Sequence, residues 1–118
     1  MKVFISQPMN GYTDTDIAAA RHKAIETLKK VYKTDIEVLD TVYTDFSADA
    51  HPLEYLGRSI SDLAKADLVY FAKGWENSRG CIIENICAIR YGLHVLEYQV
   101  LEIIESCINK REGEQHGN

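Results

Sequence analysis

A serine and a glutamate six residues apart, Ser78 and Glu84, have the types and spacing of an anion site beside a carboxylate nucleophile. They follow an apolar run, residues 67–72, and a turn at Gly74, and they open a helical pattern that ends at Gly92. The positive end of a helix dipole favours the ionised form of a glutamate in its first turns. Ser78 and the free N–H groups of that turn can hold an anion. The combination favours glycosyl chemistry on a nucleotide.

Strand and helix patterns alternate along the chain and position these two residues. Short apolar runs predict strands, and apolar residues at three- and four-residue spacing predict the helices between them. Pro52 suits the first turn of the second helix, and Gly92 suits the position just after the third. The expected strands are 2–6, 36–40, 67–72 and 93–98, the expected helices are 14–32 (capped by Asp14 or Thr15), 52–64, 79–91 and 100–110, and residues 112–118 are expected to be a frayed tail.

The alternation predicts one α/β domain of 118 residues with a flavodoxin-like, doubly wound parallel sheet. We expect four or five strands in the order 2-1-3-4, with helices on both faces joined by right-handed crossovers. In that order the switch point lies between strands one and three, where ligands bind in such sheets. The loops after Ser6 and Ala72 should therefore face each other across a crevice.

Composition and net charge limit the classes of molecule that the chain is expected to bind. The net charge of −5, with no basic block, argues against a nucleic-acid partner. No run approaches the roughly 18 apolar residues of a membrane span. Three cysteines without a C-x-x-C pair (Cys81, Cys87 and Cys107) predict reduced thiols in the cytoplasm, rather than disulfides or a zinc site. We expect no metal and no cofactor.

Two stretches resemble the nucleoside 2-deoxyribosyltransferase family, especially its short phage and bacterial relatives. They are VFISQPMNG at 3–11 and DLVYFAKGWENSRG at 67–80, the second followed four residues later by Glu84. The likeness covers roughly residues 1–98. It implies cleavage of the base–sugar bond of a 2-deoxynucleoside by a glutamate that forms a glycosyl-enzyme intermediate, and Glu84 matches that nucleophile. In relatives that hydrolyse deoxynucleoside 5′-monophosphates, a serine at the spacing of Ser78 contacts the phosphate.

The resemblance also implies a ligand site built from both stretches, and a homodimer or larger homo-oligomer that completes it. The apolar residues 100, 101, 103, 104, 107 and 108 spread over more than one face of the last helix, which favours such a contact. Ser78 is equally a candidate helix cap, and Trp75 a candidate to stack on a base or pack over the sheet. The implied ligand-binding residues are Ser6, Gln7, Pro8, Met9, Asn10, Gly11, Gly74, Trp75, Asn77, Ser78, Arg79 and Gly80.

Two departures from the family pattern leave the function open. The family usually has an aspartate as acid/base partner eight residues before the third strand begins, where this chain has Ser59. A serine does not supply a proton at neutral pH; Asp62, displaced along the helix by about 5 Å, is a candidate substitute. Phe4 replaces the usual tyrosine of strand one. The alternatives are an N-glycosidase or deoxyribosyltransferase, and a binding protein that captures a nucleotide-derived molecule of ADP-ribose type.

Side chains outside the two stretches have alternative roles as well. Cys81 is expected to be a small buried residue. His51 follows strand two and can reach the crevice. The loop aromatics Tyr12, Tyr43 and Phe46 can line a base pocket or cover the core.

Overall fold

A computed structural model describes residues 1–41, 43 and 45–116 of the chain, with side chains described through residue 113. It contains one four-stranded parallel sheet in the order β2-β1-β3-β4. This confirms the flavodoxin-like α/β fold and the strand order expected from the sequence. The elements are β1 (Lys2–Ser6), α1 (Asp14–Tyr32), β2 (Glu37–Val38), α2 (Pro52–Leu63), β3 (Leu68–Phe71), the 3₁₀ turn η1 (Trp75–Asn77), α3 (Arg79–Arg90), β4 (Val95–Glu97) and α4 (Tyr98–His116).

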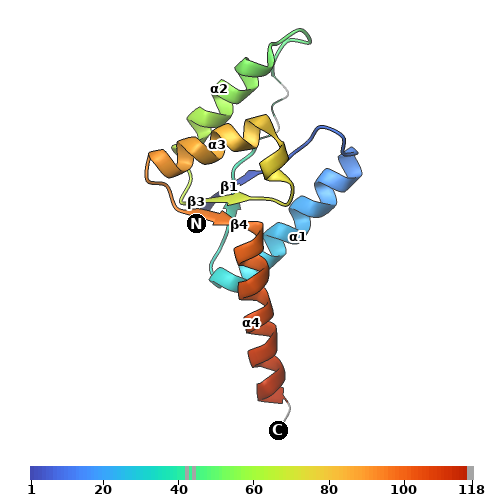
Figure 1. Cartoon of the computed structure of the whole chain (residues 1–118), viewed down its shortest axis with the longest axis vertical. Coiled ribbons are helices and arrows are strands. Elements are labelled where there is room, and N and C mark those ends of the chain that lie inside the picture. Colours follow the sequence, from blue (N-terminus) through green and yellow to red (C-terminus); the bar gives the residue numbers. More distant parts are fainter. Residues whose placement is uncertain (42, 44, 117–118) are drawn as a thin grey trace.

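Helices cover both faces of the sheet, with α2 and α3 on one side and α1 and α4 on the other (Figure 1). The alternation within β1 decides which side chain meets which layer. Val3 and Ile5 pack with Leu28 of α1 and Leu101 of α4, whereas Phe4 packs with Ala88 of α3. The central strands β1 and β3 are therefore buried on both faces, as parallel strands between two helical layers must be.

The helix termini follow the local chemistry, with one correction. The N-cap of α1 is Thr13, whose hydroxyl accepts a hydrogen bond from the Asp16 amide at 3.1 Å, and not Asp14 or Thr15. Asp14 and Asp16 lie in the first turn of α1 instead, where their negative charges interact favourably with the positive end of the helix dipole. Pro52 opens α2 as expected. Gly92 follows α3 with a φ of +72°, a conformation that favours glycine.

The outer elements differ in length from the sequence expectation. The edge strand β2 is shorter than residues 36–40, and β4 ends at Glu97 because Tyr98 already begins α4. Residues 112–116 are helical, so the prediction of a frayed tail is wrong for them. Residues 117–118 lie outside the part of the chain that the structure describes. Glu112, Glu114 and Gln115 are good helix formers, and Lys30 of α1 contacts Asn109 and Glu112. These contacts favour extension of the helix.

The last helix projects from the sheet (Figure 1), and the chain has a long axis of 60 Å. Its apolar residues divide between two environments. Leu101 and Ile104 pack against the chain's own core, whereas Val100 and Ile103 are 44 % and 63 % exposed. Within the described residues, we find no helix with the length and apolar character to cross a membrane.

Candidate functional site

A cleft of about 900 Å³ lies at the carboxyl ends of β1 and β3. The loop after β1 and the turn after β3 meet beside it, because Tyr12 and Pro8 approach Gly74 closely. This is the switch point of the sheet, where a ligand site was expected. The cleft is lined by residues 4–10, 12, 41, 43, 51–53, 55, 56, 59, 74, 77–81, 83 and 84.

Glu84 lines this cleft with only 8 % of its surface exposed. The Ser6 hydroxyl, at the end of β1, donates to Oε1 at 2.8 Å. The Ser59 hydroxyl, from α2, donates to Oε2 at 2.5 Å. Burial raises the pKa of Glu84, although both hydroxyls act in the opposite direction. Three elements therefore fix one carboxyl group beside the cleft.

This burial predicts a pH-dependent effect of Glu84→Gln on stability. A carboxyl whose folded-state pKa is raised stabilises the fold below its unfolded pKa and loses that contribution as pH rises through the folded pKa. The variant's free energy of unfolding should therefore rise relative to that of the wild type as the pH increases above about 4, the usual pKa of an unfolded glutamate. Urea unfolding at several pH values measures this difference, with Glu76→Gln at an exposed carboxylate as control. A difference that stays constant across the range would contradict the prediction.

The first turn of α3 forms one end of the cleft. The Ser78 hydroxyl accepts a hydrogen bond from the Cys81 amide at 3.4 Å, so Ser78 is the N-cap of the helix. The amides of Arg79 and Gly80 have no acceptor within the helix, because it begins there, and both residues line the cleft. Cys81 is buried, and burial raises the pKa of its thiol. The turn thus presents donors and a positive dipole end to a ligand.

Three residues of the expected site lie elsewhere. Gly11 forms a turn with a φ of +84° and does not line the cleft. Trp75 packs against the ring of Phe71 at 5.3 Å, also away from the lining. Asp62 is outside the lining and accepts a 2.5 Å hydrogen bond from Tyr43.

The charge of Asp62 also argues against the role of a substitute acid. Its pKa is lowered, first by the Tyr43 hydrogen bond and further by Lys65, whose ammonium lies 2.9 Å away. The carboxylate is therefore ionised and engaged by protein partners at neutral pH. Such a group does not donate a proton to a ligand in the cleft.

A family model described as a domain of unknown function (DUF4406) matches residues 1–97. The chain belongs to the DUF4406 family. The DUF4406 segment ends with β4, so it contains the whole sheet and all the residues that line the cleft, whereas α4 lies beyond it. No curated protein matches the chain. The family membership therefore shows which part of the chain is shared within the family. The chemistry of that part has to be inferred from the residues that line the cleft.

One wall of the DUF4406 cleft was only partly anticipated from the sequence. Pro52, Tyr55, Leu56 and Ser59 line it from a single face of α2. Their spacing of three and four residues is a signal that the sequence contained, since residues so spaced share a helix face. Thr41 also lines the cleft, and its hydroxyl is buried with no hydrogen-bond partner among the residues that the structure describes. Of the loop aromatics, Tyr12 and Tyr43 line the cleft, and Phe46 packs on Tyr55.

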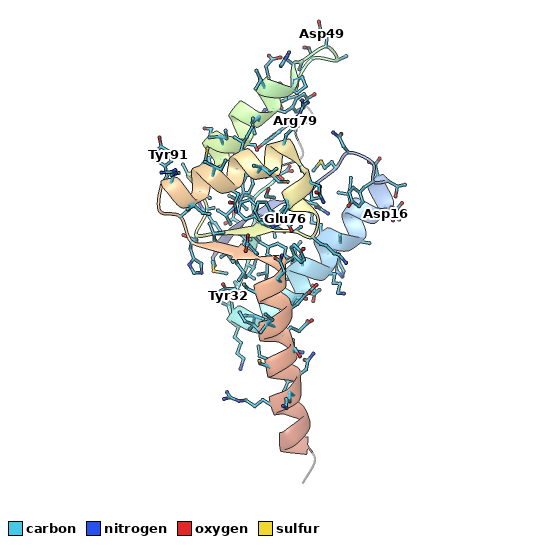
Figure 2. All side chains as sticks on the ribbon, in the orientation of Figure 1. Asp16, Tyr32, Asp49, Glu76, Arg79 and Tyr91 are labelled. Carbon is cyan, nitrogen blue, oxygen red and sulfur yellow. The ribbon has the colours of Figure 1, made fainter. Side chains whose placement is uncertain are left out.

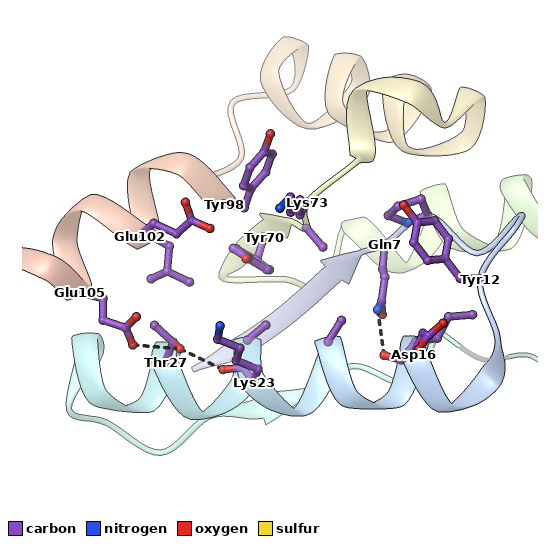
Figure 3. Close-up of a pocket in the computed structure, with 16 residues that line it drawn as sticks. Gln7, Tyr12, Asp16, Lys23, Thr27, Tyr70, Lys73, Tyr98, Glu102 and Glu105 are labelled. Carbon is purple, nitrogen blue, oxygen red and sulfur yellow. Dashed lines mark hydrogen bonds between the residues drawn. The ribbon is translucent and has the colours of Figure 1, made fainter.

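A second, smaller pocket of about 240 Å³ lies on the other face of the sheet, between α1 and α4 (Figure 3). It shares Gln7, Pro8 and Tyr12 with the main cleft, but Glu84 does not line it. Burial raises the pKa of Tyr70, on its sheet side, to about 12. Apart from the shared loop residues, this pocket contains none of the residues that the sequence suggested for a ligand site.

The remaining observations concern metals and thiols. The part of the chain that the structure describes holds no cluster of three or more His, Cys, Asp or Glu side chains suited to a metal ion. All three cysteines are free.

The cleft occupies only the N-terminal end of α3, since its lining residues on that helix extend no further than Glu84. Figure 2 shows Arg79 at this end of the helix and Tyr91 at the opposite end.

Proposed function

We propose that the cleft binds a nucleotide and that Glu84 cleaves its N-glycosidic bond. The observation that carries the proposal is the position of Glu84, a buried carboxyl group fixed by Ser6 and Ser59 beside a cleft of about 900 Å³. A retaining glycosyl transfer needs a carboxylate held against the anomeric carbon. The resemblance to nucleoside 2-deoxyribosyltransferases supports the same assignment.

The proposed reaction has two steps. An oxygen of Glu84 forms a bond to C1′ while the C1′–N bond breaks, and the base leaves with the electron pair and takes up a proton from water. Water then attacks C1′ and releases the sugar, or a second base attacks and gives a transfer product. Ser6 and Ser59 orient the carboxylate in the first step and stabilise it when it is released.

The direct test is incubation of the protein with nucleosides, nucleoside monophosphates and NAD derivatives, followed by chromatography. A free base together with a sugar or sugar phosphate supports cleavage, and a new nucleoside in the presence of a second base supports transfer. The alternative function is that of a binding protein for a nucleotide-derived molecule, and a compound that stays bound to the protein without being consumed supports it.

Ser59 favours this alternative, because it stands beside Glu84 where the resemblance implies a proton-donating aspartate.

The proposed ligand is phosphorylated, with its phosphate at the start of α3. Ser78→Asp should weaken binding of a nucleoside monophosphate much more than binding of the free nucleoside, because the new carboxylate repels the phosphate. Aspartate is also a good N-cap, so the helix should persist. Calorimetric titration of both ligands measures the two affinities. Equal losses for nucleoside and monophosphate would refute a phosphate site at this turn.

We further propose a homo-oligomer in the cytoplasm. The exposed Val100 and Ile103 of α4 favour a contact beyond the chain, and the free cysteines favour a reducing compartment. Light scattering at micromolar concentration should give at least twice the mass of the chain. A monomeric mass would contradict the assembly.

A further inference from the structure

The α2 wall of the cleft has a distinct residue at each end. Ser59, at the inner end, touches Glu84. His51, the N-cap of the same helix, lines the outer end. The eight intervening steps separate the two residues by about 12 Å along the helix axis. Tyr55 and Leu56 lie between them on the cleft side.

The hydrogen bonds of His51 determine what its ring offers to the cleft. Its Nδ1 accepts a hydrogen bond from the Leu53 amide at 3.1 Å. Its own backbone amide donates to Glu54 at 2.6 Å and completes the cap. Because Nδ1 is an acceptor, the neutral ring carries its proton on Nε2. Among the described residues Nε2 has no hydrogen-bond partner, so the ring offers a ligand a single N–H donor.

We infer that His51 reads the far edge of the nucleobase and selects bases with a carbonyl there over bases with an amino group. The inference rests on the proposed function, because it places the anomeric carbon against Glu84. A pyrimidine ring then runs along α2, and the substituent at its position 4 points away from the sugar toward the outer end of the wall. The apolar side chains of Tyr55 and Leu56 cover its face.

The length of the wall fits this arrangement. The span from Glu84 through the anomeric carbon and a six-membered ring, closed by a hydrogen bond of about 3 Å, is comparable to the roughly 12 Å that helix geometry gives between Ser59 and His51. The 4-oxo group of uracil accepts from Nε2–H. The 4-amino group of cytosine places a second donor against it, and the two N–H groups leave each other unpaired.

Equilibrium dialysis against 2′-deoxyuridine and 2′-deoxycytidine 5′-monophosphates tests the inference. The wild type should bind the uracil nucleotide about tenfold more tightly, which corresponds to one hydrogen bond made rather than lost. His51→Asp keeps an N-cap but offers only acceptors, so it should reverse the preference. His51→Gly, a tolerated N-cap that offers the base neither donor nor acceptor, should bind both nucleotides alike. His22→Asp, an exposed change on α1, is the control and should keep the wild-type ratio.

The outcomes separate this inference from the proposed function. If the wild type binds both nucleotides equally, or if folded His51→Asp and His51→Gly keep its ratio, the specificity role is wrong while the nucleotide site stands. If the wild type binds neither nucleotide, the inference fails, and the panel of nucleosides, nucleoside monophosphates and NAD derivatives decides the proposed function separately. Thermal melting shows whether each variant is folded, and His51→Gly decides the matter if His51→Asp is not.

Discussion

Glu84→Gln is expected to lower N-glycosidic cleavage by about 10⁴-fold or more, the loss typical of removing an enzyme's nucleophile. The amide keeps the shape of the side chain, and its oxygen can still accept a hydrogen bond from one of Ser6 and Ser59, while its NH2 group can donate to the other hydroxyl. It has no charge with which to attack C1′, so no glycosyl-enzyme intermediate forms. Single-turnover assays by chromatography, on whichever substrate the wild type cleaves, measure the loss.

Binding separates this loss from a collapse of the site. Glu84→Gln should retain affinity for the uncleaved substrate within about tenfold, because most of the cleft is unchanged. The matched control is Glu76→Gln, in the exposed turn η1, where the carboxylate accepts a hydrogen bond from Tyr98. Unchanged cleavage by Glu84→Gln would show that another residue is the nucleophile.

The convergence of Ser6 and Glu84 was predictable because it depends on strand order alone. Once the 2-1-3-4 order is inferred from the alternation of strands and helices, the ends of β1 and β3 must be neighbours. The helix after β3 then carries Glu84 to the loop after β1. Short-range signals were equally informative at Pro52 and Gly92, whose backbone preferences act within one turn.

Long-range partners were not predictable in the same way. Asp62 was a candidate acid by its position on α2, but its partner Tyr43 comes from the aperiodic loop before that helix. Trp75 was a candidate either to stack on a base or to pack over the sheet, and the structure places its ring on Phe71. Both positions depend on how an irregular segment folds back on the sheet. No apolar period encodes such a path.

Ser59, one of the two serines that donate hydrogen bonds to Glu84, is the position where a substitution should raise the rate of cleavage. Ser59 donates a hydrogen bond but cannot supply a proton to a departing base at neutral pH. Ser59→Asp places a second carboxyl group next to Glu84. Two carboxylates so close do not both ionise, and the pair retains one proton near neutral pH. One group can then attack C1′ while the other protonates the base.

Ser59→Asp should therefore raise cleavage by about 10²-fold, the lower end of what general acid catalysis contributes. Its pH–rate profile should become bell-shaped, with both limbs belonging to the pair rather than to either residue. Ser59→Asn is the matched control, because it keeps a hydrogen-bond donor beside Glu84 but has no titratable proton. If both variants cleave equally slowly, protonation of the base does not limit the reaction. The slow step would then lie in the attack by Glu84, whose carboxylate the serines stabilise before it reacts.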